Sequence, residues 1–221
     1  MTTYAVVGKS VTREDGPEKV SGQTCYSGDL MLPGMLWGKV LRSPLPHARI
    51  VHIDTSGASQ LPGVHAVLTG RDLAGMLVGR TLRDTPLLAQ EKVRFVGEKV
   101  AAVAAESEAI AEEALELIHV EYEELEPLLD PLEAIEPTAV LLHPNVPSYR
   151  GLLHPIEQPS NVFVHMNWKK GDVEAGFREA DIVVENIFTT KPVHQAYIEP
   201  HACVVQAQDN EIGRASCRER V

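Results

Sequence analysis

Short apolar runs separated by turn-forming residues dominate the first part of the chain. Such runs predict β-strands, and they cover residues 35–41, 50–53, 64–68, 99–104 and 120–125. Prolines 44 and 46 separate the first two runs, because proline lacks the N–H that a continuous strand pairing requires. Thr69 follows the third run and predicts the N-cap of a one-turn helix over residues 70–74.

One amphipathic helix is predicted between the last two strands, over residues 108–118, with Ser107 as its N-cap. Its apolar side chains fall on one stripe of the 3.6-residue period: Ile110, Ala111, Ala114, Leu117 and Ile118. Strand, helix and strand then follow one another within residues 99–125, which predicts a βαβ-like unit with a right-handed crossover.

The amino-acid composition changes after residue 127, where prolines become frequent. They stand at positions 127, 131, 137, 144, 147, 155 and 159. This density excludes long helices and strands and predicts an extended connector over residues 131–160. A floppy linker and a structured tie both fit the prolines, and the interspersed leucines and isoleucine favour the tie.

Beyond the connector, residues 161–168 and 181–190 predict strands, and residues 202–207 predict an antiparallel neighbour of the second. Between them, residues 173–180 predict a helix with Asp172 as N-cap. The pattern therefore predicts an α/β (α+β) protein: a first domain over residues 1–130, the connector, and over residues 161–210 the start of a larger domain.

The last eleven residues, EIGRASCRERV at 211–221, differ from everything before them. They form a basic, apolar-poor string that resembles the translation of a common sequencing-library adapter. We therefore expect residues 211–221 to be a non-native tail and the natural chain to continue differently beyond about residue 210. A solvated basic tail is the alternative.

Charge and cysteine usage narrow the class of protein. Acidic side chains number 31 and basic ones 20, a net charge of −11, which argues against a nucleic-acid partner because phosphates attract clustered Lys and Arg. The sequence contains no apolar run long enough to cross a membrane, and the first fifteen residues show no secretory signal. Three cysteines without a disulfide or metal spacing favour the cytoplasm.

Chemistry-bearing motifs are scarce. The sequence has no glycine-rich phosphate loop, no HExxH and no GxSxG, and neither Cys25 nor Cys203 has an activating histidine nearby. We expect Cys203 to act as a small apolar residue on its strand.

Two clusters of polar side chains are candidate sites. His194, Glu199 and His201 could in principle bind a metal, and we expect them not to converge. The acidic cluster Glu121, Glu123, Glu124 and Glu126 is expected to be a solvated face. Accordingly, no catalytic, cofactor-binding or metal-binding residue is assigned in this chain.

Seven motifs stand in order along residues 5–207. They are KVSG at 19–22, PGML at 33–36, RSPLPHARI at 42–50, LPGV at 61–64, RFVGEKVAAVAAES at 94–107, GDVEAGFREADIVVE at 171–185 and IEPHA at 198–202. Together they resemble the N-terminal part of the large, molybdopterin-binding subunit of the xanthine dehydrogenase and aldehyde oxidase family of molybdenum hydroxylases. RSPLPHARI is the most specific, and Gly176 stands where the family more often has alanine.

The resemblance implies an α/β-hammerhead domain followed by the truncated start of a molybdopterin-binding domain. It also implies a cytoplasmic oxidoreductase whose molybdopterin, in the cytosine dinucleotide form, is not bound by these 221 residues. Iron–sulfur and FAD cofactors are expected on two partner subunits, and the substrate is a small molecule. Gln195 and Glu199 stand closest to the expected site, and Glu199 is taken as structural.

The motifs also have structural interpretations. Ser43 is expected to bond its own turn backbone, His47 to hold the turn by a hydrogen bond, and Gly97 to permit a tight reversal. Glu98 is expected to form a surface ion pair with Arg94 or Lys99 that contributes little stability.

Two other classes of function remain open. One is a stand-alone, non-catalytic binding or assembly module of the same fold. The other is a small hydrolase that uses the acidic and histidine residues, for which the sequence offers no motif.

Overall fold

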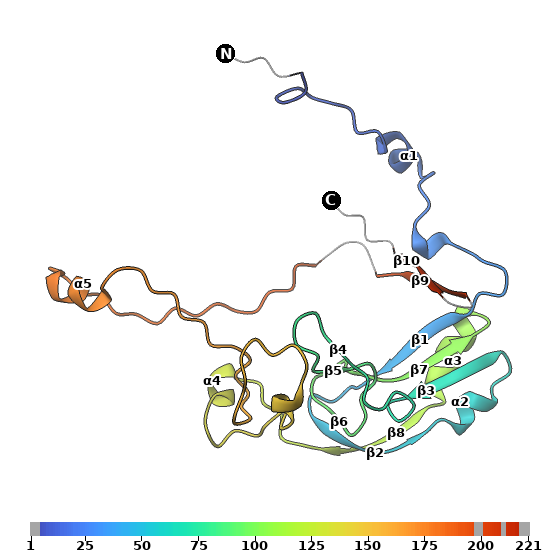
Figure 1. Ribbon diagram of the computed structural model, residues 1–221. Helices are drawn as coiled ribbons and strands as arrows, with labels where there is room; N and C mark the ends of the chain where they lie inside the picture. The colour runs from blue at the N-terminus through green and yellow to red at the C-terminus, as the bar shows by residue number, and fades with distance from the viewer. Residues whose placement is uncertain (1–4, 197–200, 209–210, 217–221) are drawn as a thin grey trace. The chain divides into compact units, whose positions relative to one another are not determined.

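The computed structural model describes residues 5–196, 201–208 and 211–216 (Figure 1). The chain separates into two units, a central unit of residues 34–180 and a terminal unit formed by residues 1–33 and 181–221. Each unit is described by itself.

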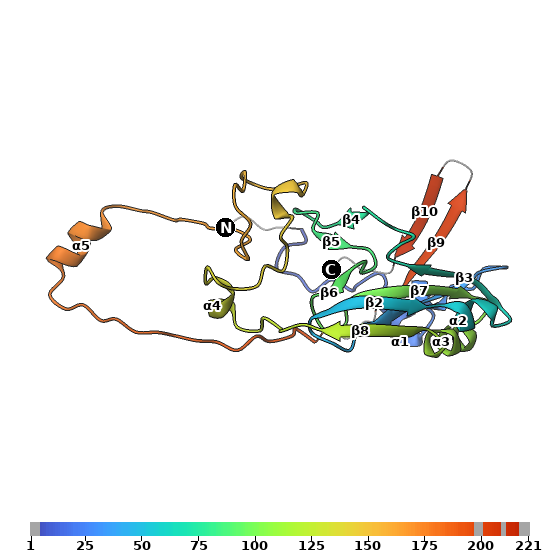
Figure 2. The same cartoon turned by 90° about the horizontal axis from the view of Figure 1, so that it is seen from below.

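Two three-stranded antiparallel sheets form the frame of the central unit (Figure 1 and Figure 2). The first has the order β1-β7-β3 and the second the order β6-β2-β8. Their strands are β1 (Trp37–Arg42), β2 (Ala48–Asp54), β3 (Val64–Thr69), β6 (Lys92–Val93), β7 (Lys99–Ala105) and β8 (His119–Glu124). A separate pair joins β4 (Leu77–Val78) to β5 (Thr85–Pro86). The five strands that the apolar runs predict are thus present, with ends that differ by at most two residues.

The βαβ prediction is wrong. β7 has β1 on one side and β3 on the other, so both of its edges are already paired. The chain leaves α3 (Glu108–Glu116) and enters β8, which pairs with β2 in the other sheet. The helix therefore connects two antiparallel sheets rather than two parallel strands of one sheet.

The main core lies where α3 packs on the first sheet, and it is built largely from alanine. Its buried members are Ala58, Ala101, Val103, Ala105, Ala111, Ala114 and Ile118. Ala58 comes from the short helix α2 (Ser56–Gln60), which contacts α3. Small side chains let helix and sheet approach closely, so the alanine-rich sequences of β7 and α3 fit one another.

The predicted cap of α3 is confirmed: the backbone N–H of Ile110 donates to the Ser107 Oγ at 3.2 Å. The helix ends two residues earlier than its apolar stripe predicts. The N–H groups of Leu117 and Ile118 bond to Ala114 and Leu115 in a tighter final turn, while Ile118 still lies in the core.

The one-turn helix predicted after Thr69 is wrong. The Asp72 carboxylate accepts from both the backbone N–H and the hydroxyl of Thr69, at 2.7 and 2.9 Å. These bonds close a turn and lower the pKa of Asp72 below its ordinary value. The Thr69 hydroxyl therefore donates to a carboxylate instead of accepting from a helical N–H.

The second half of the chain departs further from the pattern. Helix α5 (Val173–Glu179) is confirmed, with its Ala175 N–H donating to the Asp172 carboxylate at 3.0 Å. Residues 161–168 and 181–190, in contrast, form no strand, and the second prediction fails together with its pairing to residues 202–207. No strand of the described residues runs alongside either segment, so their backbone groups have no ladder to join.

The terminal unit contains helix α1 (Gly16–Ser21), the 3₁₀ turn η1 (Ser27–Asp29) and a hairpin of β9 (Cys203–Gln208) and β10 (Glu211–Ser216). β10 lies within the string that resembles a translated adapter. Ladder hydrogen bonds use backbone groups that every residue except proline carries, so this pairing is compatible with either origin of the string.

Candidate functional site

The two longest motifs of the central unit, 42–50 and 94–107, meet at one point, which we call the motif junction (Ser43, His47, Arg94, Gly97 and Glu98). The Ser43 N–H donates to the Glu98 carbonyl at 2.9 Å, and the Gly97 N–H donates to the Ser43 carbonyl at 2.8 Å. The predicted Ser43 turn is confirmed, since its hydroxyl bonds both the N–H and the carbonyl of Leu45.

Gly97 also behaves as predicted. Its φ of 91° lies in the left-handed region, where side chains other than glycine are strained. The reversal turns the Gly97 carbonyl to accept from the Arg42 guanidinium at 2.9 Å. Both motifs are therefore held together largely through backbone groups.

The ion pair predicted between Glu98 and Arg94 is present, but its predicted place on the surface is wrong, because Glu98 is buried with only 4% of its surface exposed. Its carboxylate accepts from the Arg94 backbone N–H at 2.5 Å and faces the Arg94 guanidinium at 3.4 Å. The turn at Gly97 folds the chain back on itself, and the carboxylate fills the interior of this turn. A buried carboxylate keeps its charge at a tolerable free energy only when such donors surround it.

His47 is a buried turn-holding residue, as predicted. Its Nδ1 lies 2.8 Å from the carbonyl of Glu126, and its own carbonyl accepts from the Leu125 N–H. The ring thereby holds the residues that follow β8 against the start of β2. Its Nε2 is buried without a hydrogen-bond partner within the described residues.

The proline-rich connector is attached to the motif junction. Arg94 donates from Nε to the Leu142 carbonyl at 3.2 Å. Asn161 bonds the connector internally, accepting from the Leu142 N–H and donating to the carbonyls of Ala134 and Val140. With short helices α4 (Pro131–Ala134) and η2 (Val146–Ser148), the connector is a structured tie.

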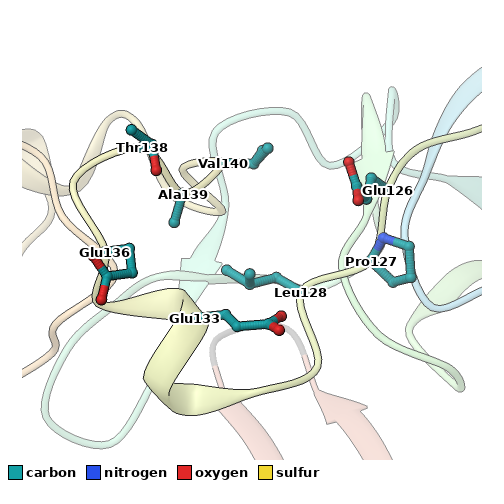
Figure 3. Close-up of a pocket in the computed structure, with 8 residues that line it drawn as sticks. All are labelled: Glu126, Pro127, Leu128, Glu133, Glu136, Thr138, Ala139 and Val140. Atoms are coloured by element: carbon teal, nitrogen blue, oxygen red, sulfur yellow. The ribbon is translucent and has the colours of Figure 1, made fainter.

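A shallow pocket of about 320 Å³ opens at the start of this connector (Figure 3). Residues 126–128 and the segment around α4 line it: Glu126, Pro127, Leu128, Glu133, Glu136, Thr138, Ala139 and Val140. Figure 3 shows three carboxylates around Leu128 and no basic side chain. Negative side chains repel a phosphate, so this pocket is unsuited to an anionic cofactor.

Two candidate clusters remain. Glu121, Glu123 and Glu124 are exposed on β8, as predicted, and Glu123 pairs with Arg49. Among the described residues no three His, Cys, Asp or Glu side chains gather as a metal site would require. Glu199, the central member of the candidate metal set, lies outside the described residues, and Gln195 is exposed.

The cysteines differ in part from expectation. Both described thiols, Cys25 and Cys203, are free and exposed. The strand predicted for Cys203 is present as β9, but the side chain is exposed and does not serve there as a small apolar residue of a core.

Two family models match the chain in succession. The aldehyde oxidase and xanthine dehydrogenase a/b hammerhead domain matches residues 21–126, and the molybdopterin cofactor-binding domain matches residues 153–216. The chain belongs to the xanthine dehydrogenase and aldehyde oxidase family. Its fold is accordingly an α/β-hammerhead domain followed by the start of a molybdopterin-binding domain, and residues 131–152 of the connector lie between the two matches.

Relatives within this family include dehydrogenase subunits. A probable xanthine dehydrogenase component of Bacillus subtilis is 41% identical over 202 residues, covering 91% of this chain and 25% of the relative. The nicotinate dehydrogenase large molybdopterin subunit of Eubacterium barkeri is 37% identical over 209 residues, covering 94% of this chain and 46% of the relative.

A solved structure of a Cu,Mo-CO dehydrogenase in its carbon monoxide-reduced state superimposes with a TM-score of 0.77 at 37% identity, covering 90% of this chain and 26% of that chain. The chain thus spans between a quarter and a half of the length of these relatives. It corresponds to part of the large molybdopterin-binding subunit of the family.

Sequence reasoning missed the buried Glu98 and its attachment to the connector through Arg94. One local signal was present: Glu98 directly follows a glycine of positive φ and precedes the buried strand β7. Residues in that position are drawn inside the turn. Nothing local indicates that Arg94 reaches residue 142, because this contact spans 48 positions.

Proposed function

We propose that this chain is the N-terminal part of the molybdopterin-binding catalytic subunit of a molybdenum hydroxylase-type oxidoreductase. The observation that carries the proposal is the succession of the hammerhead and molybdopterin-domain matches along one chain. The reaction would be hydroxylation of a small molecule, as in xanthine dehydrogenases and aldehyde oxidases, or reduction of an aromatic thioester.

The pocket by the connector does not fit the cofactor, so the residues that line it serve as scaffold in this proposal. A pyranopterin dinucleotide requires donors for its phosphates, and the pocket by the connector presents three carboxylates instead. In this proposal none of the described residues is catalytic, cofactor-binding or metal-binding. The cofactor would be bound by other parts of the subunit, in its cytosine dinucleotide form.

The partners proposed for the subunit are an iron–sulfur subunit and an FAD-binding subunit. Support comes from relatives whose names mark them as members of complexes, among them the gamma subunit of a 6-hydroxypseudooxynicotine dehydrogenase complex that is 35% identical over 215 residues. We propose the cytoplasm as the location, which suits two free, exposed thiols. No helix among the described residues is long and apolar enough to span a membrane.

The domain limits proposed above, residues 1–130, 131–160 and 161–210, remain part of this proposal, as does the adapter origin of residues 211–221. Sequencing the genomic locus across codon 210 tests the adapter origin. An open frame that continues into glycine-rich motifs supports the catalytic subunit, and a native stop codon near 210 supports a stand-alone module.

The activity is tested on the complete gene product, purified with the proteins that accompany it. We expect stoichiometric molybdenum by elemental analysis, CMP released by acid hydrolysis, and iron and FAD on separate polypeptides. A complete subunit that carries no molybdenum after expression in a molybdenum-sufficient host would refute the proposal. Loss of CMP alone would refute only the dinucleotide form.

A further inference from the structure

The start of the connector carries an exposed apolar surface beside the pocket of Figure 3. Four large apolar side chains between residues 129 and 140 are 50–78% exposed: Leu129, Leu132, Ile135 and Val140. Val140 itself lines the pocket, and the other three adjoin lining residues along the chain. We call the pocket and these four side chains the α4 surface. Apolar side chains grouped on a surface mark a place where another molecule packs.

The charge of the α4 surface is negative and unbalanced. Glu126, Glu133 and Glu136 line the pocket around Leu128 (Figure 3). None of the three carboxylates forms an ion pair with a described residue. A partner that brings a cation to this apolar surface would therefore supply a pairing that the described part of this chain does not provide.

The wall of the pocket is held in place by Asn161. Its side-chain amide donates to the carbonyls of Ala134 and Val140, at 3.1 and 2.9 Å, and its oxygen accepts from the Leu142 N–H at 3.0 Å. These bonds close residues 134–142 into a loop that contains part of the pocket lining. A wall that is fixed before binding loses little conformational freedom when a partner docks.

The size of the pocket suits a single basic side chain. Its volume of about 320 Å³ lies at the lower end of the range for small-molecule sites, about 300–1,000 Å³. Lysine and arginine combine an apolar stem with a cationic head. The stem would pack on Leu128 and the head would face the carboxylates, while neighbouring apolar side chains of the same segment would cover Leu129, Leu132 and Ile135.

The position of the α4 surface along the chain favours an occupant from another polypeptide. The hammerhead match ends at residue 126 and the molybdopterin-domain match begins at residue 153, so nearly all of the surface lies outside both domains. The molybdopterin-domain match has exposed apolar side chains of its own, among them Phe163, Trp168 and Phe177. A domain closes its core on its own residues, so the rest of that domain has these to pack on.

We propose that the α4 surface docks a partner subunit through a segment that combines apolar side chains with at least one lysine or arginine. The inference rests on the proposed function, because the partner is taken to be one of the two subunits proposed to accompany this chain. Apolar contacts would supply the packing, and the three carboxylates would select a basic segment and fix its register.

The test uses the complete subunit and the polypeptides that purify with it. The double variant Glu133→Gln and Glu136→Gln removes two charges from the pocket at nearly constant side-chain size. The matched control is Glu113→Gln with Glu116→Gln, because both are exposed on or beside helix α3 and neither forms an ion pair with a described residue.

The dissociation constant of the partner, measured at low ionic strength by analytical ultracentrifugation, should rise about tenfold or more in the pocket variant and less than about twofold in the control. An unchanged constant in the pocket variant, or an equal rise in both variants, overturns the proposal. Molybdenum is measured in the same preparations. A subunit that carries molybdenum but binds its partners equally in all forms refutes the docking surface alone, whereas absence of molybdenum refutes the proposed function.

A second measurement on the wild-type complex covers a pocket variant that fails to fold. A carbodiimide joins a carboxylate to an amine in direct contact with it, and mass spectrometry identifies the joined residues. A cross-link from Glu126, Glu133 or Glu136 to a lysine of a partner polypeptide supports the proposal. Cross-links from these carboxylates to lysines of the same subunit overturn it, because the surface is then covered from within the subunit.

Discussion

Replacing Glu98 by alanine should destabilise the central unit far more than a typical ion-pair deletion. Two groups lose their acceptor: the Arg94 backbone N–H, bonded at 2.5 Å, and the Arg94 guanidinium at 3.4 Å. An unsatisfied buried N–H costs about 1–3 kcal/mol. The guanidinium side chain keeps 19% of its surface exposed, so water compensates part of its loss and adds about 1 kcal/mol.

The expected loss is therefore about 3 kcal/mol for Glu98→Ala, and about 1–2 kcal/mol for Glu98→Gln, whose amide oxygen can still accept from the N–H. Urea unfolding measures it, because a loss of about 3 kcal/mol moves the midpoint by about 1–2 M for a domain of this size. Tryptophan fluorescence is a suitable signal: Trp37 packs against the α3 core, while Trp168 is 92% exposed and reports little.

Glu108→Ala is the matched control, because Glu108 bonds Lys39 at 2.6 Å on the surface, where Glu112 remains as a second partner. Its midpoint should stay at the wild-type value within error. If Glu98→Ala and Glu108→Ala unfolded at the same urea concentration, the inference that Glu98 acts as a buried, donor-dependent charge would be refuted.

Three further changes test the core, the cap and the turns by the same unfolding assay. Ser107→Ala removes the acceptor of the Ile110 N–H and should cost about 1 kcal/mol, while an unchanged midpoint would show that the cap contributes nothing. Val100→Ala removes a fully buried side chain that packs with Ala48, Ala89 and Val93, and it should cost about 2–3 kcal/mol; a loss under about 1 kcal/mol would mean that this cluster collapses around the gap. Gly151→Ala should destabilise the protein more than Gly97→Ala. Both glycines have a positive φ, but of the two only a Cβ at Gly151 would collide with backbone, at the Thr81 carbonyl. A larger loss of stability in Gly97→Ala would contradict this reasoning.

Local patterns determined most elements of the central unit. Strand positions, the Ser107 and Asp172 caps, the Ser43 turn and the Gly97 reversal all depend on residues within a few positions of one another. Interactions of that range involve residues that are close in sequence, so the hydrophobic periodicity and the turn-forming residues predicted them. The family was identified in the same way, from motifs made of consecutive residues.

Sheet partnership was decided only by tertiary structure. β8 pairs with β2 rather than with β7, because both edges of β7 already pair with β1 and β3, which are far from β7 along the chain. The same cause explains residues 161–168 and 181–190: their apolar composition suits strands, yet the described part of the chain offers them no neighbouring edge. Strand propensity is realised only when a partner supplies the hydrogen bonds.

Burial of charge was the other property that the sequence alone did not determine. Glu98 stands among charged neighbours and has the pattern of a surface residue, but the reversal at Gly97 encloses it and brings Arg94 against both it and Leu142. Whether a carboxylate is solvated or buried depends on which distant backbone covers it. That information arises only when the motifs 42–50 and 94–107 and the connector are assembled in space.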